Sequence, residues 1–223
     1  MRCIFLKRKF NYLIFSVIII VLGVVIFKMS DVKKDNTKVV SANLNLNLDC
    51  NSAILIEQDS QKILYKQNEN EKFPMASMTK MMGLLLVCEN IENGKINLTD
   101  EIYISANAAS MGGSQVFLQE NEKMTIDDLL KCVCIASAND AMYALSEIIA
   151  INNDAFIQMM NEKATSLNLK NTNFVNVTGF DDNNHYSSAY DMAIIALELL
   201  KYENLILKYT SLYDDYIRKD SSS

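Results

Sequence analysis

Two residues that could do chemistry together, Ser77 and Lys80, stand three positions apart in the segment KFPMASMTKMMGLLLVC, residues 72–88. A serine hydroxyl is a weak nucleophile until a base removes its proton, and a lysine amine is a base only when it is neutral. Three residues apart on a helix, the two side chains share a face and can meet. The spacing alone is weak evidence, because Ser30-Asp31-Val32-Lys33 has the same pattern. A helix-start serine followed by a solvent-facing lysine is the alternative.

The residues around the pair favour the chemical interpretation. Pro74 lies just upstream, and the apolar run Met81–Val87 follows directly, so we expect a helix over residues 77–92 with Ser77 at its start. A lysine in a helix that will be buried has a lowered pKa. The positive end of the helix dipole would also favour an alkoxide at Ser77.

A second polar group is needed opposite such a pair, and Ser137-Ala138-Asn139 could supply it. The tripeptide Ser-Ala-Asn occurs three times, at 41–43, 105–107 and 137–139, so by itself it is nearly uninformative. Only the third copy lies at a junction between two apolar helical stretches, where a short loop would be held rigidly in the interior. Helix capping by Ser137 and Asn139 remains an equally good interpretation at this point.

The chain offers little material for a metal site or a classical triad. His185 is the only histidine, so a site with several histidine ligands is impossible, and a Ser-His-Asp triad would have to use it. The five cysteines have neither zinc-ligand spacing nor the pattern of a disulfide framework. We therefore expect no metal, and cysteines that pack as small hydrophobic side chains.

The N-terminus resembles an export signal. Arg2, Lys7, Arg8 and Lys9 precede a charge-free run from Tyr12 to Phe27. Upstream cations place the N-terminus in the cytoplasm, so everything after this run is expected to be exported. The run suits either a cleaved signal peptide or an uncleaved membrane anchor. We predict a signal or anchor segment at 1–27, a polar linker at 28–48 and a partial catalytic domain at 49–223.

Charge is divided unevenly between these parts. Residues 1–42 hold eight of the 21 Lys+Arg and two of the 27 Asp+Glu, so residues 43–223 carry 13 cations against 25 anions, a net charge of −12. An exported domain this acidic is a poor candidate for binding nucleic acid or anionic lipid.

The rest of the pattern predicts a helix-rich domain with one hairpin in front. Ala53–Glu57 and Lys62–Lys66 read as two short strands around a turn. A lone hairpin is marginal in water, so either the helix beginning at Ser77 covers it, or the missing strands belong to a longer parent sequence. Residues 101–124 are turn-rich and irregular. Further helices are expected from Thr125 almost to Ser137, and over residues 140–151, 154–167, 188–202 and 203–212.

The order of these features is similar to that of a known family. PMASMTKMMGLLL, GGSQVFLQENEKMTIDDLLKCVCIASANDAMYALSEIIA and NTNFVNVTGFDDNNHYSSAYDMAIIALELL resemble, in turn, the nucleophile motif, the second-motif region and the following stretch of the serine D-Ala-D-Ala carboxypeptidases, the low-molecular-weight penicillin-binding proteins. The resemblance covers about residues 43–212. The joint spacing of the motifs is specific although each motif alone is weak.

The resemblance implies the α+β penicillin-recognising serine hydrolase fold, a helical subdomain plus an incomplete antiparallel sheet. It implies Ser77 as the acylated nucleophile, Lys80 as its base, Ser137 as the proton donor to the leaving D-alanine, and Asn139 as the ligand of the peptide carbonyl. The Ser77 N–H would form half of the oxyanion hole. The substrate would be the peptidoglycan stem peptide, β-lactams would be covalent inhibitors, and no cofactor would be needed. His185 would be structural.

The sequence also departs from the family pattern. The third motif, Lys-Thr-Gly or Lys-Ser-Gly on a strand, is absent, and Thr178-Gly179 follows Val177 in a loop that normally has proline there. The absent strand would supply the second oxyanion donor, worth about 3 kcal/mol in the transition state. The chain therefore resembles the front portion of such an enzyme. The rivals are a catalytically incompetent wall-binding or regulatory fragment and, less favoured because the tripeptide is not Ser-Asp-Asn and no deacylating glutamate is evident, a serine β-lactamase.

Overall fold

The structure is a computed structural model that describes residue 46 and residues 48–218. The chain divides into two units, residues 1–43 and 44–223, and the described residues all belong to the second unit. The expected export segment at 1–27 and nearly all of the expected linker lie outside the described residues. Within the described part of the chain, no helix is long and apolar enough to cross a membrane.

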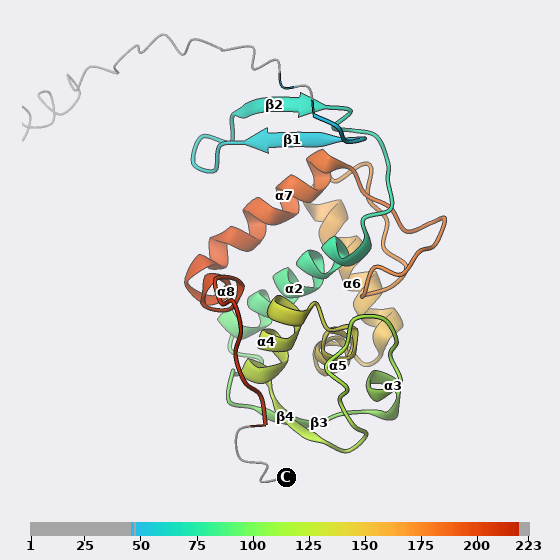
Figure 1. The fold of residues 1–223 in the computed structure, drawn as a ribbon, viewed down its shortest axis with the longest axis vertical. Helices are drawn as coiled ribbons and strands as arrows, with labels where there is room; N and C mark the ends of the chain where they lie inside the picture. The colour runs from blue at the N-terminus through green and yellow to red at the C-terminus, as the bar shows by residue number, and fades with distance from the viewer. Residues whose placement is uncertain (1–45, 47, 219–223) are drawn as a thin grey trace, which may run out of the picture. The chain divides into compact units, whose positions relative to one another are not determined.

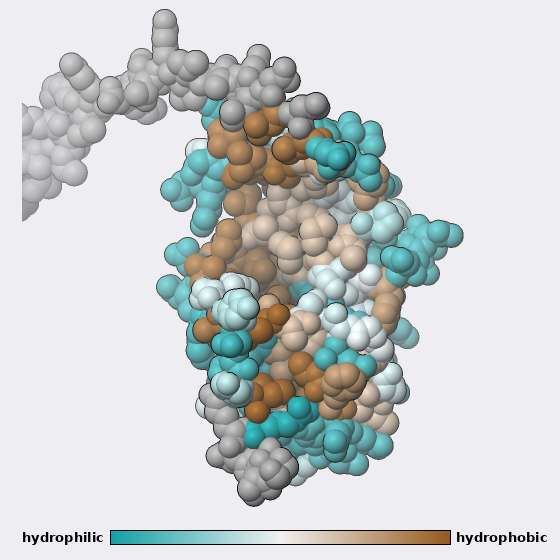
Figure 2. All heavy atoms as spheres, viewed as in Figure 1, coloured by the Kyte–Doolittle hydropathy of each residue, from teal (hydrophilic) through white to brown (hydrophobic). Residues whose placement is uncertain are grey.

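The predicted hairpin is confirmed. Strands β1 (Ala53–Ile56) and β2 (Ile63–Gln67) pair antiparallel, with Leu55 opposite Tyr65 and an irregularity after Leu55. Figure 2 shows apolar surface in the region of this hairpin. Leu55, Ile63 and Leu64 of the two strands are exposed.

The helix that packs under the hairpin is α7 (Ala189–Leu199), and α7 in turn packs against α2 (Lys80–Glu92) (Figure 1). Of the two alternatives offered for the lone hairpin, cover by the helix beginning at Ser77 is therefore wrong, because α7 takes that place. The sequence AYDMAIIALEL explains why α7 takes this place, because a helix that is apolar nearly all round must be buried on more than one side.

The helical part follows the predicted pattern. Helix α4 (Ile126–Ala136) starts after Thr125, whose hydroxyl accepts a hydrogen bond from the Asp128 N–H at 3.0 Å, as the capping pattern predicted. Helix α5 (Asn139–Ile149) packs against α4 and α2, and α6 (Asn153–Ser166) packs against α5. A 3-10 turn, η2 (Leu200–Tyr202), and α8 (Glu203–Thr210) end the described helices.

The expected irregular excursion contains short elements that sequence patterns do not reveal. Strands β3 (Glu101–Tyr103) and β4 (Lys123–Thr125) pair antiparallel, and α3 (Ala106–Ala109) lies between them in the sequence. Three residues are too few to show a strand period. In the described residues the strands form two separate two-stranded sheets, which agrees with a helical subdomain and an incomplete sheet.

Candidate active site

The predicted nucleophile lies on a 3-10 turn, η1 (Ala76–Thr79), which runs directly into α2. The helix was expected to begin at Ser77, and the regular α-helix begins at Lys80 instead. Ala76 has a φ of +47°, an uncommon conformation for a residue other than glycine. Ser77 is exposed, so its hydroxyl is accessible to a substrate.

Lys80 is buried, with 3% of its surface exposed, and its amine meets the predicted nucleophile. Nζ lies 3.0 Å from Ser77 Oγ and 2.9 Å from the carbonyl oxygen of Thr178. None of the ion pairs among residues 48–218 includes Lys80. Burial therefore lowers the pKa of Lys80 to about 8, which makes the neutral amine accessible near physiological pH.

The loop of residues 176–180 holds this pair from the other side. A Cβ at Gly179, whose φ is +93°, would stand 1.9 Å from the carbonyl oxygen of Ala76, so only glycine fits there. The side-chain oxygen of Asn176 accepts the N–H groups of Thr178, Gly179 and Phe180, at 3.2, 2.7 and 3.1 Å. The sequence analysis assigned this loop no role at the site. Gly179 was the only residue of the loop whose type indicated a close backbone contact.

Ser137 and Asn139 lie in the tight junction between α4 and α5. Ser137 adopts the left-handed conformation at the end of α4, with a φ of +52°. Asn139 begins α5, is buried, and donates from Nδ2 to the carbonyl of Gly112 at 2.7 Å, while its backbone N–H donates to the carbonyl of Ser114 at 2.7 Å. Ala138 and Asn139 in this junction are buried, whereas Ser137 is half-buried.

The two halves of the predicted site meet through a third segment. A Cβ at Gly113 would stand 2.7 Å from Asn139 Nδ2 and 3.3 Å from the ring of Phe180, and Phe180 follows the glycine that contacts Ala76. Among the hydrogen bonds of the described residues, none joins Ser137 or Asn139 directly to Ser77 or Lys80. The structure therefore brings Ser77 and Lys80 into direct contact. Asn139 is connected to them only indirectly, through Gly113 and the loop of residues 176–180.

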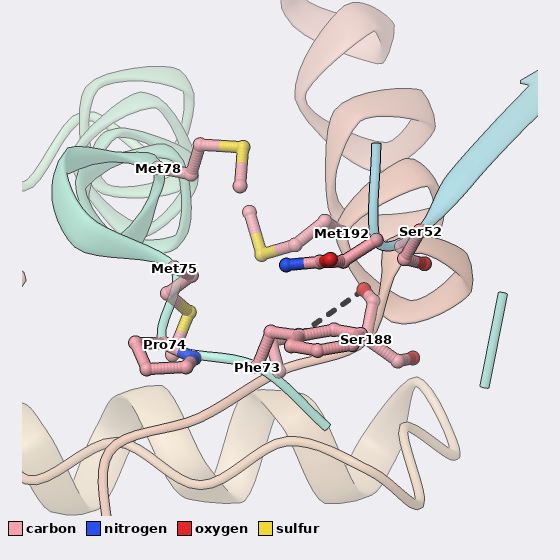
Figure 3. A pocket seen from close by; sticks show the side chains of 10 residues that line it. Ser52, Phe73, Pro74, Met75, Met78, Ser188 and Met192 are labelled. Carbon is pink, nitrogen blue, oxygen red and sulfur yellow. Dashed lines mark hydrogen bonds between the residues drawn. The ribbon is translucent and has the colours of Figure 1, made fainter. Parts of the chain in front are cut away.

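An apolar cavity of about 340 Å³ lies beside the nucleophile turn (Figure 3). Met78 from η1 and Met192 from α7 direct their thioether ends toward one another across it, and Phe73 and Pro74 line the opposite wall. No lining residue is titratable, so the cavity contributes shape but neither an acid nor a base.

The described residues contain no group of three or more His, Cys, Asp or Glu side chains that could hold a metal ion. Cys88 and Cys132 are buried, and burial raises the pKa of each thiol to about 12, so both are inert at neutral pH. Cys50 is exposed, contrary to the expectation that the cysteines pack as hydrophobic side chains.

Comparison with known proteins identifies the family. The family model "D-alanyl-D-alanine carboxypeptidase" matches residues 36–222. D-alanyl-D-alanine carboxypeptidase DacF of Bacillus subtilis is 44% identical over 216 residues, which are 97% of this chain and 53% of DacF. The chain belongs to the D-alanyl-D-alanine carboxypeptidase family of penicillin-binding proteins.

Solved structures support the same assignment. Penicillin-binding protein 5 of Haemophilus influenzae superposes with a TM-score of 0.75 at 34% identity, covering 78% of this chain and 52% of that protein. Penicillin-binding protein D2 of Listeria monocytogenes, solved in its cefotaxime-bound form, gives 0.69 at 25% identity, covering 78% of this chain and 71% of that protein. The α+β penicillin-recognising fold is therefore confirmed. The chain spans about half the length of DacF.

Proposed function

We propose that this chain carries the nucleophile and base of a serine D-Ala-D-Ala carboxypeptidase that removes the terminal D-alanine from peptidoglycan stem peptides. The observation that supports this most directly is the exposed Ser77 hydroxyl, 3.0 Å from the amine of a buried lysine that has no ion-pair partner among residues 48–218. A lysine in this environment can act as a general base because burial disfavours its charged form.

The proposed reaction proceeds through an acyl-enzyme. Neutral Lys80 takes the Ser77 hydroxyl proton, and Oγ attacks the carbonyl carbon of the penultimate D-alanine, which Asn139 binds. The C–N bond to the terminal D-alanine breaks, and Ser137 passes a proton to the departing amine while it receives the one that Lys80 took from Ser77. Water then hydrolyses the ester, releasing the shortened peptide and restoring Ser77. A β-lactam would form the same ester, as an opened ring that stays attached.

We also propose that the domain works on the extracytoplasmic face of the membrane, tethered or delivered by residues 1–27. The supporting observations are the cations before the apolar run and the acidity of residues 43–223. Stem peptides lie on that face, and an acidic domain has no attraction to nucleic acid.

The test is covalent labelling with a fluorescent penicillin. The full 223-residue chain, purified in detergent, should give a labelled band that is lost in Ser77→Ala and weakened about a hundredfold or more in Lys80→Met. Ser166→Ala, which changes an exposed serine at the end of α6, is the matched control and should label like the parent chain.

The second candidate is a non-catalytic wall-binding or regulatory fragment. It is favoured by the lack of a direct hydrogen bond from Ser137 to the Ser77–Lys80 pair within the described residues. A chain that is folded by circular dichroism and sediments with purified peptidoglycan, but takes up no penicillin, would support this candidate over the enzyme.

A further inference from the structure

The imidazole of His185 is buried between two segments of the chain, with 2% of the residue exposed. Its Nδ1 accepts a hydrogen bond from the backbone N–H of Val175 at 3.1 Å, and its Nε2 lies 2.7 Å from Thr79 Oγ1. A neutral imidazole has one donor and one acceptor nitrogen. Because Nδ1 must accept, the proton is on Nε2, which donates to the hydroxyl of Thr79.

Thr79 connects this ring to the candidate active site. It is completely buried and stands on η1 between Ser77 and Lys80. The neighbours of His185 in the sequence fasten its loop on both sides: Ser187 exchanges two backbone hydrogen bonds with Phe73, at 2.8 and 3.1 Å, and Tyr186 exchanges two with Asn173, at 2.9 and 3.1 Å. The imidazole is therefore held in place beside the nucleophile turn and contacts that turn through Thr79.

We propose that His185 is a positioning residue for Ser77: in its neutral Nε2–H form it holds Thr79, and through Thr79 the turn that keeps the Ser77 hydroxyl at the amine of Lys80, and a second proton on the ring releases this hold. The proposal rests on the proposed role of Ser77 as the nucleophile. It differs from the assignment of His185 as a purely structural residue, because it predicts a dependence of acylation on the protonation state of the ring.

Protonation breaks the contact between Nδ1 and the Val175 N–H for a geometric reason, and a ring displaced from Val175 no longer holds its Nε2 at Thr79. An imidazolium carries N–H groups on both nitrogens, so its Nδ1–H would point at the N–H of Val175, and two donors would oppose each other in the interior.

The charges near the ring act in opposite directions. Asp181 and Asp182, in the same loop, favour the imidazolium, but burial is the stronger effect and lowers the pKa of His185 below its ordinary value of 6.5. From the other segments, Thr79, Val175 and the edge of the Phe174 ring are uncharged.

The two nearby lysines are directed elsewhere. Lys80 directs its amine to Ser77 and Thr178, and Lys72 lies over the Tyr186 ring. Because burial lowers the pKa of His185 below its ordinary value, the ring is neutral at pH 7, and the contact with Thr79 is lost only when the pH falls below that lowered pKa.

Penicillin labelling of the full chain at pH 7.5 tests the positioning. Thr79→Val, which keeps the shape and removes the hydroxyl, and His185→Ala should each slow labelling about tenfold. Thr79→Ser and His185→Gln should recover most of that loss, because a hydroxyl and an amide can restore the contacts. Labelling of Thr79→Val and His185→Ala at the parent rate would overturn the proposal.

The pH profile separates positioning from mere packing. Protonation of Lys80 slows the parent chain and His185→Gln alike as the pH falls. The ratio of the parent rate to the His185→Gln rate should nevertheless fall, about fivefold or more, between pH 7.5 and a pH below the titration midpoint measured for His185, because protonation releases only the histidine. A constant ratio would contradict the proposal.

A third measurement does not require acylation. His185 is the only histidine in the chain, so its ¹⁵N imidazole signals are assigned without ambiguity. They should show the Nε2–H tautomer, a titration midpoint below 6.5, and a change of that midpoint in Thr79→Val.

Amide hydrogen exchange is a second measurement that does not require acylation. The protection of residues 76–80 should fall with the protonation of His185 in the parent chain but not in His185→Gln. If the parent chain takes up no penicillin, the proposed function fails, but the NMR and exchange measurements still test the role of His185. An Nδ1–H tautomer, or amide protection of residues 76–80 that does not change when His185 is protonated, would overturn the proposal.

Discussion

Gly179 lies so close to Ala76 that a Cβ on the glycine would stand 1.9 Å from the Ala76 carbonyl oxygen and 2.9 Å from the Ser77 nitrogen. Both residues have positive φ, +93° and +47°. The contact presses the loop of residues 176–180 against the backbone beside the nucleophile, and Thr178 from the same loop accepts from Lys80 at 2.9 Å. Backbone-to-backbone contact of this kind leaves little room for adjustment.

Gly179→Ala should therefore destabilise the fold by about 3 kcal/mol or more, because positive-φ strain and a backbone collision act together. Two other glycines separate these effects. Gly94 has a φ of +66° but open space around it, so Gly94→Ala should cost about 1 kcal/mol from backbone strain alone. Gly112 has neither a positive φ nor a close neighbour, so Gly112→Ala should be nearly neutral. Urea unfolding followed by circular dichroism measures all three, and equal costs for Gly179→Ala and Gly94→Ala would contradict the collision.

Lys80 should make stability depend on pH in the alkaline range. Its pKa is about 8 in the folded chain and 10.5 in the unfolded chain, so between these values only the unfolded state holds the proton. Raising the pH then favours folding, by up to about 3 kcal/mol over the whole window. The difference in free energy of unfolding between the parent and Lys80→Met, which does not titrate, should rise accordingly.

Asp140 should be a strong structural contributor although it lies beside a predicted site residue. It is completely buried, and its carboxylate accepts the N–H groups of Val116, Leu118 and Ala141, at 3.1, 3.0 and 2.9 Å. Asp140→Asn exchanges an acceptor oxygen for a donor group facing these N–H groups, and should cost about 2–3 kcal/mol in urea unfolding. Asp59→Asn, at an exposed turn, should change stability by no more than about 0.5 kcal/mol.

Gly83 should show how closely α2 packs against α5. A Cβ there would stand 2.7 Å from the terminal methyl of Met142, the far end of a flexible side chain. Gly83→Ala should therefore change stability by less than about 1 kcal/mol, because the gain in helix propensity offsets the adjustment of the methionine. Gly83→Leu cannot be accommodated this way and should cost about 3 kcal/mol by thermal unfolding. A stable Gly83→Leu variant would show that the two helices are not in close contact.

Most of the helices and the hairpin could be predicted from the sequence, because their signals are local. Thr125 with Asp128 marks a helix start, and the boundaries of α4 to α8 lie within a few residues of those expected. The pairing of β3 with β4 could not be predicted, since it joins segments about twenty residues apart and three residues long. The placement of α7 under the hairpin also depends on which faces meet in three dimensions.

The candidate site divides in the same way. The spacing of Ser77 and Lys80 lies within one helical turn, so the sequence determined that their side chains could meet, and the apolar residues after Lys80 determined its burial. The hydrogen bond from the Lys80 amine to the Thr178 carbonyl and the contact of His185 with Thr79 each join residues about a hundred positions apart. Only tertiary packing decided these contacts, because a backbone carbonyl carries no side-chain signature and a buried imidazole takes its role from whatever faces its two nitrogens.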